Sequence, residues 1–201
     1  VSDAAAPIRV VPVAGGGSRT LTEAREYDEL DSWTADGSHL AVRTRTNGHT
    51  TLLDVPIGDG QAAEIATPPE ATRTMLSSDR KHLFYVVTDS VTDRKGLWVR
   101  RLSDGRTRVI ARDLVSPDQF TGGPGGRGQW PFNGEEILFF ERRGDRGELR
   151  GCAPEGQPHV LRSFPLRNAG DVVGVHGERV AWVEVLGDSS ALLVAEGPNG
   201  T

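Results

Sequence analysis

The 201-residue sequence has one cysteine, one methionine and few aromatic residues, which make up 6% of the chain. The single cysteine, Cys152, excludes a disulfide within the chain and leaves the redox compartment open. No apolar run approaches the roughly 18 to 20 residues that a helix needs to cross a bilayer. Residues 1–7 lack the apolar core of a secretory signal. We expect a chain that does not itself span a membrane, with any signal or anchor outside these residues.

The chain also has fewer basic than acidic residues, because 23 Lys and Arg against 28 Asp and Glu give a net charge of −5. Such a balance does not attract a phosphate backbone, so nucleic acid is not an expected partner. What the sequence has in abundance is 25 glycines and 12 prolines, spread along the chain. They interrupt long helices and favour many short strands joined by turns.

The stretch 32–43 joins a tight Asp-Gly turn to an alternating apolar strand. The same turn–strand pattern recurs three more times along the chain in weaker form. The matching strand positions are spaced 43, 54 and 43 residues apart, at Leu40, Leu83, Ile137 and Val180. A later glycine turn is spaced 43, 45, 51 and 44 residues apart, at Gly17, Gly60, Gly105, Gly156 and Gly200. Two markers with one period of roughly 40 to 50 residues are typical of β-propeller blades.

We therefore predict an all-β fold: a β-propeller of about four four-stranded blades, either partial or a fragment of a longer propeller. The single domain spans 1–201, with blade units near 1–23, 24–67, 68–113, 114–164 and 165–201. The predicted strands of the three full units are 30–34, 39–45, 51–57 and 62–66; 72–76, 81–87, 97–102 and 107–111; and 129–132, 136–141, 148–152 and 159–162. Inner strands such as 137–140 are apolar on both faces, whereas 97–102 alternates.

The two ends of the chain carry incomplete units. Residues 8–13 and 18–22 match the last two strands of a blade, and 171–175, 179–185 and 191–195 match the first three. This count gives 17 strands, whereas four blades need 16. The ring closes if 18–22 completes the last blade. In the alternative, the chain is part of a longer propeller or has covered edges, since open strand edges promote aggregation.

At these repeats the chain resembles the TolB-type propeller family, whose WD-like "PD repeat" unit is aromatic-Ser-Pro-Asp-Gly followed by a strand. The segment 33–42, Trp-Thr-Ala-Asp-Gly-Ser-His-Leu-Ala-Val, matches well; 77–85 and 130–139 match loosely, and 15–22 matches the closing strand. The chain lacks the proline of the motif, and the last unit is degraded. The resemblance implies a propeller that binds proteins, often outside the cytoplasm. Similar propellers also cap prolyl-oligopeptidase-like peptidases, and no catalytic residue carries over.

Few motifs in the sequence could bind a ligand or take part in a reaction, and each also has a structural interpretation. Gly123, Gly125 and Gly128 have dinucleotide-binding spacing, but no helix is predicted after them, which favours a flexible loop. His39 and His82 occupy one position in successive units, which favours packing or a bond to a neighbouring turn over metal binding. Asp36 and Asp79 are expected to accept hydrogen bonds from their own turns. A reactive Cys152 is disfavoured because no partner histidine is evident.

No nucleophile signature is present, so we predict no catalytic, cofactor-binding or metal-binding residue and no enzyme activity. Exposed aromatic residues are candidates for partner contact, because interface energy concentrates in a few aromatic and arginine anchors. The candidates are Tyr27, Trp98, Phe120, Trp130 and Phe132. Packing between blades is the alternative interpretation of each.

The predicted function is a non-enzymatic scaffold that mediates protein–protein interaction, as an accessory subunit of a larger complex. Its expected partners are other protein subunits, including those of a membrane complex, and its expected location is periplasmic or extracytoplasmic. Two alternatives stay open: the lid of a prolyl-oligopeptidase-like serine peptidase, and a sensor that binds a small ligand or ion in the central channel.

Overall fold

The computed structural model describes residues 7–22, 28–33, 37–46, 49–77, 79–115, 132–133, 136–165, 169–176, 179–186 and 189–196. Side chains are described for 7–22, 33, 37–44, 51–77, 79–115 and 136–165. These ranges hold 17 strands in five antiparallel sheets. Within them no helix is both long and apolar enough to cross a bilayer.

Three four-stranded sheets are simple meanders, which we call the first, second and third blades. The first consists of β3 (Asp28–Trp33), β4 (His39–Thr46), β5 (His49–Pro56) and β6 (Ala63–Ile65). The second consists of β7 (Ala71–Leu76), β8 (His82–Thr88), β9 (Lys95–Arg101) and β10 (Thr107–Ala111). The third consists of β11 (Phe132–Asn133), β12 (Glu136–Arg143), β13 (Arg146–Cys152) and β14 (His159–Pro165). Each observed strand overlaps the range predicted from the sequence.

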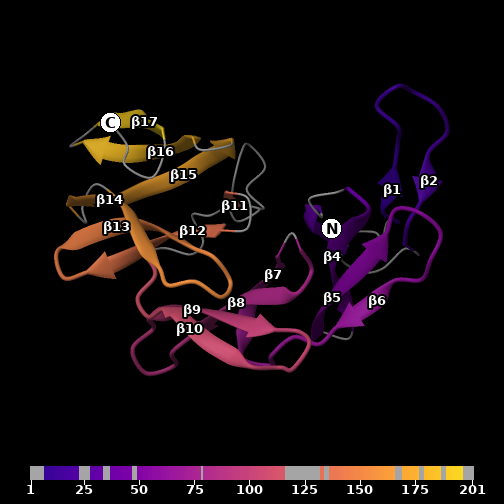
Figure 1. Ribbon diagram of the computed structural model, residues 1–201, viewed down its shortest axis with the longest axis horizontal. Helices are drawn as coiled ribbons and strands as arrows, with labels where there is room; N and C mark the ends of the chain where they lie inside the picture. The colour runs from indigo at the N-terminus through magenta and orange to yellow at the C-terminus, as the bar shows by residue number, and fades with distance from the viewer. Residues whose placement is uncertain are drawn as a thin grey trace, which may run out of the picture.

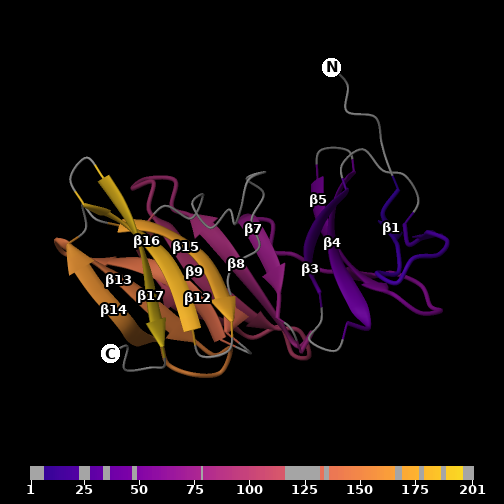
Figure 2. The ribbon, with the colours of Figure 1, turned by 90° about the horizontal axis from the view of Figure 1, so that it is seen from above.

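Two incomplete sheets flank these blades, as the sequence predicts. The fourth blade has three strands, β15 (Ala169–His176), β16 (Arg179–Leu186) and β17 (Ser189–Glu196). At the other end of the chain, β1 (Arg9–Val10) and β2 (Arg19–Thr20) form a hairpin. The blades follow one another around an arc in Figure 1, and Figure 2 shows the same succession from above.

At two of the blade junctions the first strands lie against one another, as they do around the axis of a propeller. β3 contacts β7, and β11 contacts β15. Each blade then continues outward through its second, third and fourth strands. The prediction of an all-β, partial propeller is therefore confirmed.

The alternative in which residues 18–22 complete the last blade is wrong in the part of the chain that the structure describes. Arg19 and Thr20 of β2 pair with β1, whereas β17 pairs with β16. The hairpin and β17 lie at opposite ends of the arc (Figure 1). Ile8 and Leu21 flank the hairpin and pack on the buried side chains of β4 and β5, which explains why it joins the first blade.

The largest core cluster lies between the second and third blades. It joins Phe84, Leu97 and Val99 of the second blade to Ile137 and the following residues of β12. Residues 137–140 are all buried, as predicted for a strand that is covered on both faces. In β9 only Leu97 and Val99 are buried, which confirms the predicted alternation.

Backbone hydrogen bonds join the segment that follows the last strand of the second blade to the third blade. The segment 112–115 follows β10, and Leu114 forms a bridge with Glu141 of β12. The N–H of Val115 donates to the carbonyl of Phe140 at 3.1 Å, and the N–H of Arg142 donates to Asp113 at 2.8 Å. The two blades are thus joined by backbone bonds as well as by apolar packing.

The close approach of Phe164 to Gly147 leads to a first prediction. A Cβ on Gly147 would lie 2.6 Å from Cε2 of Phe164, a buried ring that packs edge-on against Phe140. Gly147→Ala should therefore lower the free energy of unfolding by about 1 to 3 kcal/mol through overpacking. Urea denaturation measures this loss. Gly58→Ala is the control, because a Cβ there meets nothing within 4 Å. Equal stability of the two variants would show that Phe164 moves without cost.

Candidate functional site

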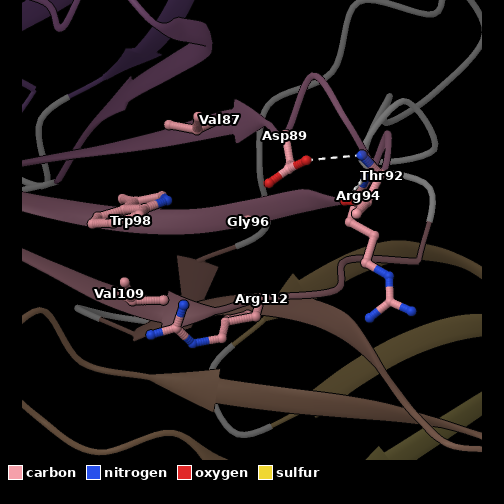
Figure 3. A pocket seen from close by; sticks show the side chains of 9 residues that line it. Val87, Asp89, Thr92, Arg94, Gly96, Trp98, Val109 and Arg112 are labelled. Atoms are coloured by element: carbon pink, nitrogen blue, oxygen red, sulfur yellow. Dashed lines mark hydrogen bonds between the residues drawn. The ribbon is translucent and has the colours of Figure 1, made fainter.

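A groove of about 300 Å³ opens on the second blade where β8 and β9 are joined by their loop. Its floor is formed by residues that are direct cross-strand partners and therefore share one face of the sheet. Trp98 pairs with Val109, and Gly96 pairs with Val87. Figure 3 shows Trp98, Val87 and Val109 gathered on three adjacent strands. We call this feature the Trp98 groove.

Trp98 stacks on a neighbouring ring, and a glycine beside it leaves space for the indole. Its ring stacks on buried Tyr85, with centroids 6.3 Å apart and planes 20° from parallel. Burial, together with the charge of Glu70, raises the pKa of Tyr85. A Cβ on Gly96 would lie 3.3 Å from the indole Nε1, so this glycine leaves room for the ring. The indole is partly exposed, and it forms the aromatic part of the groove.

Trp98 lines the groove, and partner contact stays a prediction for it and for the other four candidates. Tyr27, Phe120 and Trp130 lie outside the described residues, and for Phe132 the structure describes only the backbone, in β11. The Gly-rich segment 121–128 and Asp36 also lie outside them.

The loop 89–94 borders the groove and is fixed by its own hydrogen bonds. Asp89 Oδ1 accepts from the N–H groups of Thr92 at 2.8 Å and Val91 at 2.9 Å. These bonds lower the pKa of the Asp89 carboxyl. The Asp89 N–H donates to the carbonyl of Arg94 at 2.8 Å, and Asp93 adopts a left-handed φ of 54°. The loop presents Val91, which is 90% exposed and was not singled out in the sequence.

Two arginines give the groove a cationic rim. Arg94 lies 3.7 Å from Asp113, and the exposed Arg112 side chain extends back toward Val109 (Figure 3). Within the described residues Arg112 forms no ion pair; its backbone N–H donates to Glu141 at 3.3 Å. The Asp89 carboxylate is engaged by its own loop. The groove therefore offers an apolar floor beside a guanidinium that has no ion-pair partner among the described residues.

A second hollow lies where the turns of the second and third blades meet. It consists of two adjoining cavities of about 520 and 180 Å³ that share His82, Arg101 and Glu155 in their lining. The remaining charged residues that line them are Arg80, Lys81, Arg106 and Arg108. We call this feature the basic cleft.

His82 bonds a neighbouring turn, which confirms the prediction from its position in the repeat. Its Nε2 lies 2.8 Å from Glu155, in the turn between β13 and β14 of the third blade. His39, its counterpart in the first blade, bonds Asp54 of its own blade at 3.0 Å. Asp54 also pairs with Arg80 of the second blade. Both histidines therefore belong to polar links at the blade junctions.

Ser77, Asp79 and His82 lie together but do not form a nucleophile–base pair. The Ser77 hydroxyl donates to Asp79 at 2.6 Å and accepts from the His82 backbone N–H at 3.0 Å. Asp79 also accepts from the Lys81 N–H at 3.0 Å, which confirms its predicted bond to its own turn. Burial tends to raise the pKa of Asp79, but these bonds and nearby positive charges outweigh it and lower the pKa. The trio stabilises the turn.

Cys152 is completely buried, and burial raises the pKa of its thiol. The thiolate is the reactive form, so this environment disfavours nucleophilic chemistry. Among the described residues, no three His, Cys, Asp or Glu side chains converge in a way that could hold a metal ion.

Comparison with solved structures places the chain among propellers. The chain matches TolB from Acinetobacter baumannii with a TM-score of 0.59 at 15% identity, covering 96% of this chain and 47% of that chain. It matches a TolB-type structure from Agrobacterium tumefaciens with a TM-score of 0.60 at 13% identity, covering 99% and 69%. The β-propeller domain of the trilobed protease from Pyrococcus furiosus gives a TM-score of 0.51 at 13% identity, covering 85% and 56%.

No protein-family model and no curated protein sequence matches the chain. The chain spans about half the length of the Acinetobacter structure that it resembles. At these identities the likeness concerns the fold alone, and the chain has a TolB-like β-propeller fold.

Proposed function

We propose that the chain is a non-catalytic β-propeller that binds another protein through the Trp98 groove. The observation that carries this proposal is that the partly exposed Trp98 and the exposed Arg112 line one groove, which is bordered by the loop that carries the 90% exposed Val91. Tryptophan and arginine are the residue types that most often dominate binding energy at protein interfaces. The groove does not offer a set of groups suited to catalysis. The polar side chains that line it are those of Asp89, Thr92 and the two arginines.

The proposal extends to a wider role. We propose an accessory or structural subunit of a larger extracytoplasmic assembly, in the periplasm and associated with a membrane complex. The likeness to TolB structures supports this proposal at the level of fold. Partner binding would use the rigid blades to position loops such as 89–94, which is how propellers and other scaffolds present recognition surfaces.

A second candidate is the propeller domain of a serine peptidase. One observation favours it: a similar structure is the propeller domain of a protease. In that case the catalytic part lies elsewhere in a longer chain. Reading the full-length gene for a Gly-x-Ser-x-Gly elbow decides between the two functions. An elbow within the following few hundred codons would favour the peptidase.

The Trp98 groove is tested by capturing proteins from a native extract on the immobilised chain. Trp98→Ala should weaken binding of the specific partner by about 2 kcal/mol or more, a roughly 30-fold higher Kd. Arg112→Ala should weaken it too, and its exposed side chain makes misfolding an unsuitable explanation. Biosensor titration with the eluted partner gives the Kd of each variant.

Trp33→Ala is the matched control, because Trp33 is a 47% exposed tryptophan on β3 of the first blade. It should leave the Kd within about twofold of the unsubstituted chain, as expected for residues outside an interface. Circular dichroism confirms that each variant is folded. If Trp98→Ala and Arg112→Ala both bind as tightly as Trp33→Ala, the groove is not the docking site.

A further inference from the structure

The basic cleft concentrates positive charge on a chain that is acidic overall. Five Lys and Arg side chains and His82 line it, and Glu155 is the one carboxylate in the lining. Two carboxylates just outside the lining also pair with its cations: Asp104 with Arg101 and Arg106, and Asp54 with Arg80. Lys81, Arg108 and His82 carry the remaining positive character of the cleft. The whole chain carries a net charge of −5. Such a local excess of one sign in a hollow focuses the electrostatic field and attracts the opposite charge.

Glu155, the carboxylate that lines the cleft, indicates which chemical group its cations recognise. Arg101 holds Glu155 in a two-pronged contact, with Nε donating to Oε1 at 2.9 Å and a terminal nitrogen 2.8 Å from Oε2. His82 Nε2 lies 2.8 Å from the same Oε1. The hydrogen bonds from His82 and Arg101 lower the pKa of Glu155. A planar guanidinium fork matches the geometry of a carboxylate, so this part of the cleft is built for that group.

Glu155 is a solvent-exposed side chain rather than a buried member of the core. Its side chain is 59% exposed, and it lies in the turn between β13 and β14. His82, by contrast, is 7% exposed and is fixed at the start of β8. One recognising group, His82, is therefore buried, whereas Arg101, at 38% exposed, and the carboxylate that both hold face solvent.

Two cations of the cleft, Lys81 and Arg108, form no ion pair with a carboxylate among the described residues. Arg108 donates to the carbonyl oxygens of Pro154 at 2.6 Å and Ala153 at 3.4 Å, and within the described residues it forms no ion pair. Lys81 likewise forms no ion pair there. Arg106 is 83% exposed and reaches Asp104 at 3.5 Å. A ligand with several carboxylates in a row would complement these groups.

We propose that the basic cleft binds an acidic segment of a partner protein, with one carboxylate replacing Glu155 at Arg101 and others pairing with Lys81 and Arg108. This inference rests on the proposed function and names the chemistry of the partner. It concerns a surface separate from the Trp98 groove, because the cleft is formed by turns 80–82, 102–106 and 153–156 and the groove by the loop 89–94.

Isothermal titration with a capped hexaglutamate peptide tests the inference on the 201-residue chain, with capped hexaglutamine as the neutral control. Hexaglutamate should bind and hexaglutamine should not. Arg101→Gln should weaken hexaglutamate binding roughly tenfold, as expected for the loss of a charge-assisted pair. Glu155→Gln should tighten it several-fold, because the competing carboxylate is gone. Raising the salt concentration should weaken binding throughout.

Two variants outside the cleft serve as matched controls. Arg146→Gln removes an exposed arginine of β13, and Glu70→Gln removes an exposed carboxylate before β7. Both should leave hexaglutamate binding unchanged. Inorganic phosphate should bind more weakly than the peptide, since it engages only one subsite.

Absence of hexaglutamate binding, or binding that Glu155→Gln weakens, would overturn the inference. So would phosphate binding as tight as that of the peptide, which would indicate a small-anion site. Trp98→Ala should leave hexaglutamate binding unchanged. Failure of the peptide to bind, together with Trp98-dependent partner capture, would thus refute the acidic segment and leave the proposed function standing.

Discussion

Phe139→Ala is expected to lower the free energy of unfolding by about 3 to 5 kcal/mol, the range for removing a buried phenylalanine ring. Phe139 is 0% exposed in β12 and belongs to the cluster that joins the second and third blades. Its neighbours Leu138 and Phe140 are buried as well, so the strand is covered on both faces. The backbone of a central strand cannot collapse into the cavity, and the packing loss is not recovered.

Urea denaturation followed by circular dichroism measures this effect. Val160→Ala is the control, because Val160 is 46% exposed on β14 of the same blade and should change stability by no more than about 0.5 kcal/mol. A loss below about 1 kcal/mol for Phe139→Ala would contradict the buried blade-to-blade core.

The second large effect is expected at Glu141, a carboxylate that is 2% exposed in β12. It lies 2.8 Å from both Arg150 and Arg143 and accepts the Arg112 backbone N–H at 3.3 Å. The Arg150 side chain is only 13% exposed, so removing Glu141 leaves a largely buried charge without its closest partner. Glu141→Ala should lower the free energy of unfolding by about 3 to 5 kcal/mol.

Glu148→Ala provides a matched control for this prediction. Glu148 lies 3.5 Å from the same Arg150, but its side chain is 20% exposed, so its loss should cost less than about 1 kcal/mol. Hydrogen exchange adds an independent readout, since Glu141→Ala should speed exchange at the Arg112 amide that it binds. Equal costs for the two glutamate substitutions would show that burial of Glu141 does not determine its contribution.

The strands could be predicted from the sequence because their signals are local. The Asp-Gly turn before Leu40 and the alternation in 97–102 each specify a turn or a strand within a few residues. Their spacing then predicts stacked blades. Which sheet an edge hairpin joins is not local, and the contacts of Ile8 and Leu21 with the first blade decide it.

The candidate site was only partly visible in the sequence. Trp98 stood out as an aromatic residue in an alternating strand. Val91 was missed because its exposure depends on a loop fixed by Asp89, although an Asp followed by Ser-Val-Thr is a signal for side-chain-to-backbone turn bonds. The basic cleft was missed because its parts are far apart in sequence: His82 and Glu155 are separated by 73 residues. The net negative charge of the whole chain also gives no indication of a local group of positive side chains.

A partner protein that docks on the Trp98 groove should protect the backbone amides of the groove. Hydrogen–deuterium exchange of the chain, alone and in complex with the captured partner, measures this protection. We expect slower exchange on binding in 87–98 and 109–112, with the amides of β4 and β5 unchanged. Slower exchange confined to the first blade, with 87–98 and 109–112 unaffected, would contradict docking on the groove.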